Sequence, residues 1–289
     1  MLPWKRWLRP LAALALTAAA VLTPPPPPPP PPPHRPRRAA AGTTTAASRP
    51  PRTPRPVVLV HGTFANSVDN WLVLAPYLVN RGYCVFSLDY GQLPGVPLIH
   101  GLGRSTSRPS SCGLRRQGAR RHGAPEADLV GHSQGGMMPR HYLKFLGGAD
   151  KVNALVGIAP DNHGTTLLGL TKLLPHFPGA EKFLNDKTPA LADQIAGSPF
   201  LTRLNEGGDT VPGVQYTVIA TRYDQVVTPY RSQYLDGPNV RNVLVQDLCP
   251  VNISEHVAIG TIDRIAFHEV ANALDPANAT PTNCGSVIN

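Results

Sequence analysis

A serine between two glycines is the feature that most constrains the fold of this 289-residue chain. Residues 131–135 read Gly-His-Ser-Gln-Gly, after a short strand-like stretch at residues 126–130 and before a helix-compatible run at residues 136–146. Glycine is needed on both sides because the backbone of a tight strand-to-helix turn is strained and crowded. The pattern predicts a strand, a sharp turn that exposes the Ser133 hydroxyl, and a helix. The alternative is a purely structural turn.

A serine nucleophile needs a histidine as its base and a carboxylate that orients the histidine. Downstream of Ser133, residues 215–221 predict a strand, and Asp224 lies just past its end. Parallel sheets place their sites at that end of their strands, so Asp224 is the favoured acid and a surface or capping role is the alternative. Two weaker candidates lie in a Gly-Gly turn and near the end of a strand predicted at residues 240–248, namely Asp209 and Asp247.

Two histidines follow Asp224 in the chain. His256 lies in a predicted loop, residues 253–256, after the last strand, whereas His268 lies inside a predicted apolar-periodic helix at residues 262–274. The loop placement and the order serine, acid, histidine favour His256 as the base. Its imidazole would accept the Ser133 proton and later hand it to the leaving alcohol.

An oxyanion hole is predicted after the first strand. Residues 57–60 are wholly apolar and lead into His61, Gly62, Thr63 and Phe64. A backbone N–H of this loop and the N–H of Gln134 would together supply two donors. Thr63 is the first choice in the loop and Phe64 the second, and a simple β-turn is the alternative.

Several segments in combination resemble the secreted bacterial class 2 lipases of the α/β-hydrolase fold. They read PVVLVHGTFANSVDN, ADLVGHSQGG, APDNHGTT, RYDQVVTP and ISEHVAIG, and the resemblance covers about residues 56–103 and 124–289. It implies a mostly parallel central sheet flanked by helices, a helical lid-like insertion, and a triacylglycerol lipase or carboxylesterase without a cofactor. The family's nucleophile, acid and base fall on Ser133, Asp224 and His256. Its oxyanion donors fall on the Thr63/Phe64 loop and Gln134.

Residues 160–200 are apolar and interrupted by proline and glycine. We interpret them as helices over the mouth of the site, because ligand sites are mostly apolar. An ordinary packed helix pair is the alternative, since leucines at helical spacing usually mean core. The residues expected to line an acyl pocket are Leu167, Leu168, Leu170, Leu173, Leu174 and Phe177.

The N-terminal part of the chain reads as an export signal and a spacer. Residues 1–23 combine a basic start with an apolar run and small residues, as signal peptides do, and a retained membrane anchor is the alternative. Residues 24–55 begin with ten consecutive prolines and continue as a basic linker, which we expect to be disordered. Residues 56–289 are predicted to form a single catalytic domain.

Positive charge is concentrated in two places. Residues 1–56 hold nine of the 27 basic residues and residues 104–122 hold six, without any acidic residue in either stretch. The rest of the chain holds the remaining 12 basic residues and all 18 acidic ones, so its net charge is −6. This distribution argues against nucleic acid as a partner, because nucleic-acid sites need basic clusters on the folded surface.

Residues 104–122 lack the periodicity of a helix although a crossover helix is expected between parallel strands. We hypothesise a compensated frameshift in this aberrant segment, and a divergent basic loop is the alternative. Resequencing the gene distinguishes the two.

Four cysteines occur, and export makes a disulfide possible. Cys84 falls in a predicted buried strand and Cys112 in the aberrant segment. The expected disulfide is therefore Cys249 with Cys284, although spacing alone leaves other pairings open. No metal-ligand spacing is visible, because the histidines are scattered.

The sequence thus predicts a secreted, monomeric serine lipase or carboxylesterase that needs no metal or cofactor and has no stable membrane anchor. Its substrate would be a lipid or related ester at an interface, cleaved through an acyl-enzyme. One rival hypothesis keeps the mechanism but assigns cutin-like polyesters as substrates. The other is a catalytically inactive protein on the same scaffold.

Overall fold

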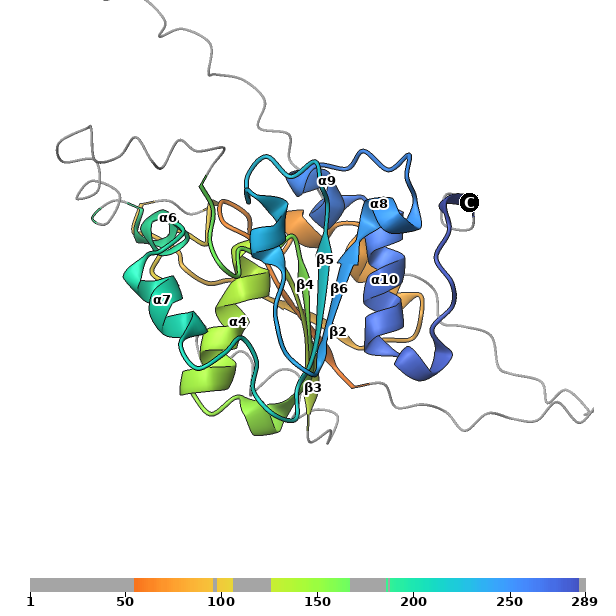
Figure 1. Ribbon diagram of the computed structural model, residues 1–289, viewed down its shortest axis with the longest axis horizontal. Coiled ribbons are helices and arrows are strands. Elements are labelled where there is room, and N and C mark those ends of the chain that lie inside the picture. Colours follow the sequence, from red (N-terminus) through yellow and green to blue (C-terminus); the bar gives the residue numbers. More distant parts are fainter. Residues whose placement is uncertain (1–54, 96–97, 106–125, 167–185, 187, 286–289) are drawn as a thin grey trace, which may run out of the picture. The chain divides into compact units, whose positions relative to one another are not determined.

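The computed structural model describes residues 55–95, 98–105, 126–166, 186 and 188–285 (Figure 1). The predicted signal peptide, almost all of the linker and most of the aberrant segment lie outside these residues. So do the six residues expected to line an acyl pocket. Within the described ranges, no helix has the length and apolar character needed to cross a membrane.

Six strands form a parallel central sheet in the order β2-β1-β3-β4-β5-β6. Parallel sheets are covered by helices on both faces, so the sequences of their strands are continuous apolar runs. All four residues of β1 are buried, which fits this rule and confirms the predicted sheet type. The strands are β1 Val57–Val60, β2 Val85–Leu88, β3 Ala127–His132, β4 Val152–Ile158, β5 Gln215–Ala220 and β6 Val240–Leu244.

Helices lie on both sides of the sheet (Figure 1). On one face α4, Gln134–Phe145, packs on β3 and β4, and on the other α1, Leu74–Val79, packs with α10, Arg264–Leu274. β1 serves both layers, since Leu59 packs in the α1–α10 cluster and Val58 in the cluster that includes Leu143 of α4. The shorter helices are η1 Asp69–Trp71, η3 Ala149–Lys151, α6 Pro189–Asp193, α7 Pro199–Asn205, η5 Tyr230–Gln233, α8 Val245–Leu248, α9 His256–Thr261 and η6 Pro276–Asn278.

The strand predicted at residues 240–248 is too long. β6 ends at Leu244, and the next four residues form α8. The helical turn lets the buried Gln246 amide reach the loop after β5, where Nε2 donates to Thr221 Oγ1 at 2.8 Å and Oε1 accepts from the Arg222 N–H at 3.0 Å. A period-two pattern carries no information about these tertiary hydrogen bonds. The predicted strand was therefore wrong beyond Leu244.

The prediction that Cys84 lies in a buried strand is also wrong. Cys84 comes just before β2 and is half-buried. β2 is the edge strand beside β1, and its residues are half-buried or exposed because one of its sides has no neighbouring strand in the sheet.

The predicted disulfide between Cys249 and Cys284 is present. Both cysteines pack against the cluster formed by α1, α10 and the sheet. The bond therefore joins the C-terminal segment to the segment just ahead of His256.

A buried arginine joins α4 to the end of α7 and the loop that follows it. Arg140 is fully buried, and its guanidinium donates to the Asp209 carbonyl at 3.0 Å, to Asn205 Oδ1 at 2.6 Å and to Asp209 Oδ1 at 3.3 Å. The Asp209 carboxylate also accepts from His163 Nε2 at 3.1 Å and from the Asp236 N–H at 2.8 Å. The hydrogen bonds to the guanidinium and to Asp209 compensate a charge that would otherwise be costly to bury.

We expect Asp209→Asn to destabilise the fold by about 3 kcal/mol, because it leaves the buried Arg140 charge without its counter-ion. Urea unfolding measures the loss. Asp247→Asn is the matched control, since the Asp247 side chain is 72% exposed and pairs with Arg222 at the surface. The control is expected to change stability by less than about 1 kcal/mol. Equal losses in the two variants would contradict this account of Asp209.

Candidate active site

Ser133 stands in a strained turn between β3 and α4. Its backbone has φ 54° and ψ −127°, a conformation that an L-residue adopts only under structural constraint. The crowding around it explains both flanking glycines. A Cβ on Gly131 would lie 1.8 Å from the Gly135 carbonyl oxygen, and one on Gly135 would lie 2.0 Å from the Val60 oxygen. The predicted strand–turn–helix is therefore present, and α4 approaches the backbones of β1 and β3 too closely for any other residue at these two positions.

Asp224 and His256 form a buried pair. His256 Nδ1 lies 2.8 Å from Asp224 Oδ2, and the exposed fractions of their side chains are 6% and 0%. Asp224 Oδ1 accepts from the N–H groups of Val226 and Val227 at 2.8 and 2.7 Å, and Oδ2 also accepts from Gln233 Nε2 at 2.9 Å. These bonds hold the carboxylate in one orientation, with one oxygen directed at the imidazole.

The residue before Ser133 connects the serine turn to His256. His132 Nε2 donates to the His256 carbonyl oxygen at 2.9 Å, and the two rings lie 5.1 Å apart. Gly260 makes this approach possible, because a Cβ there would lie 2.3 Å from the His132 ring. Burial, and secondarily the charge of His256, lower the pKa of His132 to about 3. His132 is therefore neutral at pH 7 and acts as a fixed hydrogen-bond donor.

His256 begins a helix rather than lying in a loop, so that part of the prediction was wrong. It is the first residue of α9, and Glu255 caps the helix by accepting from the N–H groups of Val257 and Ala258 at 2.9 and 2.8 Å. Glutamate is not among the usual N-cap residues, so the sequence carried no recognisable start signal.

The competing candidates lie in other surroundings. Asp209 belongs to the Arg140 cluster, and Asp247 is an exposed residue of α8. His268 of α10 contacts Thr282 Oγ1 at 2.7 Å and Thr280 Oγ1 at 3.0 Å. Of the candidates considered from the sequence, Asp224 and His256 are the carboxylate and the histidine that the fold brings together.

The loop after β1 is joined to the start of α4 by side chains. Thr63 Oγ1 donates to Gln134 Oε1 at 3.2 Å and accepts from Gln194 Nε2 at 2.9 Å. The Phe64 N–H donates to the His100 carbonyl at 3.0 Å, whereas no hydrogen bond between described groups engages the Thr63 N–H. Gln134 is the first residue of α4, so its N–H has no partner within the helix. Among the predicted oxyanion donors, the N–H groups of Thr63 and Gln134 thus have no hydrogen-bond partner within the part of the chain that the structure describes.

Sequence reasoning missed Asn70 and Gln233. Asn70 is buried in η1, and its Oδ1 accepts from the Gly62 N–H at 2.9 Å and lies 3.3 Å from His132 Nδ1. It therefore holds the loop after β1 by a hydrogen bond and only contacts the unprotonated Nδ1 of His132. Gln233 is fully buried in η5 and holds Asp224. Neither amide has a motif or a periodicity that distinguishes it from a surface residue.

Asp161, a buried acid in the segment just after β4, was also missed. Burial, the largest cause, raises the pKa of this carboxyl to about 7, and the Asp224 charge acts in the same direction. Because the folded state keeps this proton up to about pH 7 while an unfolded aspartate loses it near pH 4, folding is favoured at low pH. This stability declines as the pH rises from about 4 to about 7 and is then fully lost.

We therefore expect Asp161→Asn to remove this pH dependence. The unfolding free energy of the variant minus that of wild type should increase by about 2–3 kcal/mol from pH 5 to pH 8, since each pH unit within the window contributes about 1.4 kcal/mol. Urea unfolding at the two pH values measures the difference. A difference that does not change with pH would contradict the assignment.

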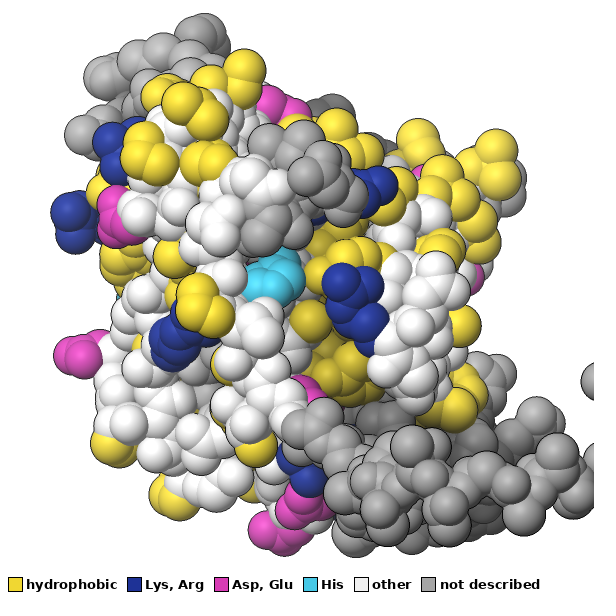
Figure 2. Space-filling view, turned by 90° about the vertical axis from the view of Figure 1, so that its right-hand side faces the viewer, with side chains coloured by type: hydrophobic (Ala, Val, Ile, Leu, Met, Phe, Trp, Pro, Cys, Tyr) yellow, Lys and Arg dark blue, Asp and Glu magenta, His cyan; other side chains and the backbone are white. Residues whose placement is uncertain are grey.

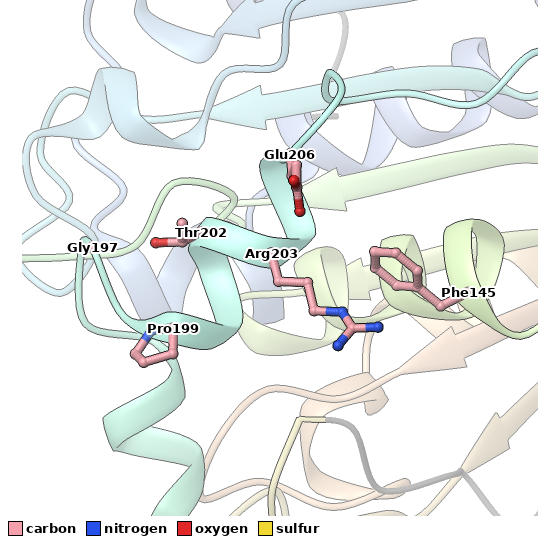
Figure 3. Close-up of a pocket in the computed structure, with 6 residues that line it drawn as sticks. All are labelled: Phe145, Gly197, Pro199, Thr202, Arg203 and Glu206. Carbon is pink, nitrogen blue, oxygen red and sulfur yellow. The ribbon is translucent and has the colours of Figure 1, made fainter.

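A surface hollow of about 710 Å³ lies between the end of α4 and α7 (Figure 3). Phe145, Pro199, Thr202, Arg203 and Glu206 line it, and the Arg203 guanidinium lies 5.5 Å from the centre of the Phe145 ring. None of these residues takes part in the hydrogen bonds around Ser133, Asp224 and His256. The hollow is therefore separate from the candidate site.

Comparison with known proteins agrees with this architecture. Among solved structures, the chain is similar to lipase B of Aspergillus fumigatus, with a TM-score of 0.60 and 21% identity over 80% of this chain and 54% of that one. This chain thus spans about half the length of that lipase. It is also similar to mouse alpha/beta hydrolase domain-containing protein 10, with a TM-score of 0.51 and 16% identity over 78% and 90% of the two chains. At these identities the likeness concerns the fold.

The sequence pattern of the Alpha/beta hydrolase family matches residues 57–285, which is most of the chain. The match includes every strand of the sheet, the turn at Ser133 and the Asp224–His256 pair. The protein therefore belongs to the alpha/beta hydrolase family.

Proposed function

We propose that this protein is a serine hydrolase that cleaves carboxylic esters through an acyl-enzyme on Ser133. The observation that supports this most directly is the buried Asp224–His256 pair, whose histidine carbonyl is hydrogen-bonded to the residue preceding the strained serine. A serine, a carboxylate and a histidine, in this chain order, are the arrangement that activates a hydroxyl nucleophile in this fold.

In the proposed reaction, Ser133 Oγ attacks the ester carbonyl carbon while His256 Nε2 takes the hydroxyl proton. The tetrahedral intermediate collapses, the bond to the alcohol oxygen breaks, and His256 returns the proton to that oxygen. Water then attacks the acyl-enzyme by the same route and releases the acid and free Ser133. Asp224 stays ionised, accepts a hydrogen bond from the Nδ1–H of His256 throughout, and stabilises the imidazolium that forms.

The proposed oxyanion donors are the N–H groups of Thr63 and Gln134. Phe64, the second choice from the sequence, is the weaker candidate because its N–H is already engaged by the His100 carbonyl. The Thr63 hydroxyl and the Gln134 side chain are hydrogen-bonded to each other, which fixes the relative position of the two N–H donors before substrate binds.

A water-insoluble ester is the proposed substrate class. Large apolar side chains are exposed on the segments that carry the site, including Phe64 at 56%, Leu72 at 67% and Ile253 at 79%. On the face shown in Figure 2, hydrophobic side chains reach the surface in groups, with Lys and Arg scattered among them. Exposed apolar groups of this kind favour contact with lipid or ester phases.

The finer assignments are also proposals. They are membership of the secreted class 2 lipases, hydrolysis of acylglycerols, export by residues 1–23, and action as a monomer. The disulfide and the signal-like N-terminus support export. Cutin-like polyesters remain the rival substrates, and an inactive scaffold protein is the rival of another class.

We expect a fluorophosphonate probe to label wild-type protein on Ser133. Ser133→Ala should lose the label and at least about 10⁴-fold in kcat for p-nitrophenyl butyrate, because the nucleophile is gone. Ser232→Ala is the control, since Ser232 is a half-buried serine whose Oγ donates to the Gly164 carbonyl at 2.8 Å, and it should keep both label and activity.

Absence of label from folded wild type would overturn the enzyme proposal and favour the inactive scaffold. Hydrolysis of triolein emulsions and of polyester films then separates the two substrate classes. An enzyme that degrades films and leaves emulsions untouched would support the polyester rival.

Asp224→Asn should lower kcat by about 10³–10⁴-fold without unfolding the protein, because the amide cannot hold His256 in the required tautomer. Asp209→Asn is the matched comparison, since it removes another buried carboxylate that lies outside the site. That variant should be less stable yet active at temperatures where it remains folded. The assignment of Asp224 as the acid would be wrong if Asp209→Asn lost activity while folded and Asp224→Asn lost only stability.

A further inference from the structure

Two histidines and an aspartate meet beside the loop that follows β1. His61 comes directly after β1, Asp89 follows β2, and His100 lies in a separate segment, so the fold rather than the sequence spacing assembles them. One potential ligand atom from each residue lies within 4.8 Å of the other two. His100 Nδ1 is 3.0 Å from Asp89 Oδ1, and His61 Nε2 is 3.8 Å from the same oxygen.

The His61 ring presents a lone pair to this cluster. His61 Nδ1 lies 2.8 Å from the Gly62 carbonyl oxygen, so Nδ1 carries the proton and Nε2 is unprotonated. The Tyr90 N–H approaches Nε2 at 3.4 Å, which is a long contact. His61 therefore directs an unprotonated nitrogen, the form that binds a metal ion, at the cluster.

The surroundings orient His61 and Asp89. The Tyr90 ring stacks on His61 with centroids 4.4 Å apart. The Asp89 carboxylate accepts from the Ser67 N–H at 2.7 Å and from Ser67 Oγ at 2.9 Å. Hydrogen bonds of this outer kind hold ligands in place in known metal sites. The Asp89 side chain is 46% exposed, so an ion can reach the cluster from solvent.

We propose that His61, Asp89 and His100 form a binding site for a divalent transition-metal ion of the Zn²⁺ type. Two imidazole nitrogens and one carboxylate oxygen suit this class of ion, with water completing the tetrahedron. Ligand atoms of a tetrahedral zinc site lie about 3.3 Å apart, a value between the two separations of 3.0 and 3.8 Å. On binding, the ion replaces the His100 Nδ1 proton, which moves to Nε2 of that ring or to solvent.

The position of the site gives the ion a structural role. His100 exchanges two backbone hydrogen bonds with the loop after β1, from the Phe64 N–H at 3.0 Å and to the Ala65 carbonyl at 3.2 Å. A Cβ on neighbouring Gly101 would lie 2.8 Å from the Gly62 oxygen, so these backbones touch. A bound ion would join the segment around His100 to the loop that carries Thr63. It would stabilise this loop without entering the ester chemistry, so the site stands or falls independently of the proposed function.

The test uses tag-free full-length protein, stripped with EDTA and titrated with ZnCl₂ by calorimetry, with elemental analysis for stoichiometry. Wild type should bind one equivalent with a Kd of about 1 µM or tighter, and Zn²⁺ should raise its melting temperature. Co²⁺ should give the visible absorption of a tetrahedral nitrogen–oxygen site.

Asp89→Asn, on the exposed side of the cluster, and His100→Asn should each weaken Zn²⁺ binding at least tenfold. Ser67→Ala should weaken it by about tenfold, because it loosens the Asp89 carboxylate.

His268→Asn is the control, because His268 is a partly exposed histidine on α10 and should leave the affinity unchanged. Three outcomes would overturn the proposal. They are no saturable Zn²⁺ binding below about 100 µM, equal affinity in Asp89→Asn and wild type, and equal stabilisation by Mg²⁺, which does not favour imidazole ligands.

Discussion

The close approach of three backbones at the serine turn is the constraint on which the rest of the structure depends. Gly135, at the start of α4, lies against the end of β1, and Gly131 of β3 lies against Gly135. A side chain at either glycine would push α4 away from the sheet. The same contact that seats α4 on the strands gives Ser133 its positive φ, so the fold and the geometry of the proposed nucleophile have one cause.

Buried side-chain amides extend this arrangement to the neighbouring loops. Asn70 holds the loop after β1 through the Gly62 N–H, Gln233 orients Asp224, and Gln246 joins the loop after β5 to α8. Each amide serves a segment at or near the end of a strand, where backbone groups leave the sheet and need new partners. The loops that carry the site are thus positioned by interior hydrogen bonds rather than by their own conformational preferences.

Much of the fold could be predicted from local patterns. Apolar runs predicted the strands of a parallel sheet because both of its faces are covered, and the apolar period of α10 predicted its helix. Predictions failed where a tertiary contact overrode the local pattern, as when Gln246 turned residues 245–248 into α8. They also failed where an unusual cap, Glu255, began α9 at His256.

The sequence by itself determined the turn at Ser133, the aspartate just past β5 and the chain order of serine, aspartate and histidine. These are local features, because they depend on the spacing of glycines and on the residue types at the ends of strands. Only the tertiary structure decided that Asp209 neutralises Arg140 while Asp224 faces His256, and that His61, Asp89 and His100 meet. The physical reason is that such contacts join residues far apart in the chain, and their partners are set by strand order and packing rather than by any local periodicity.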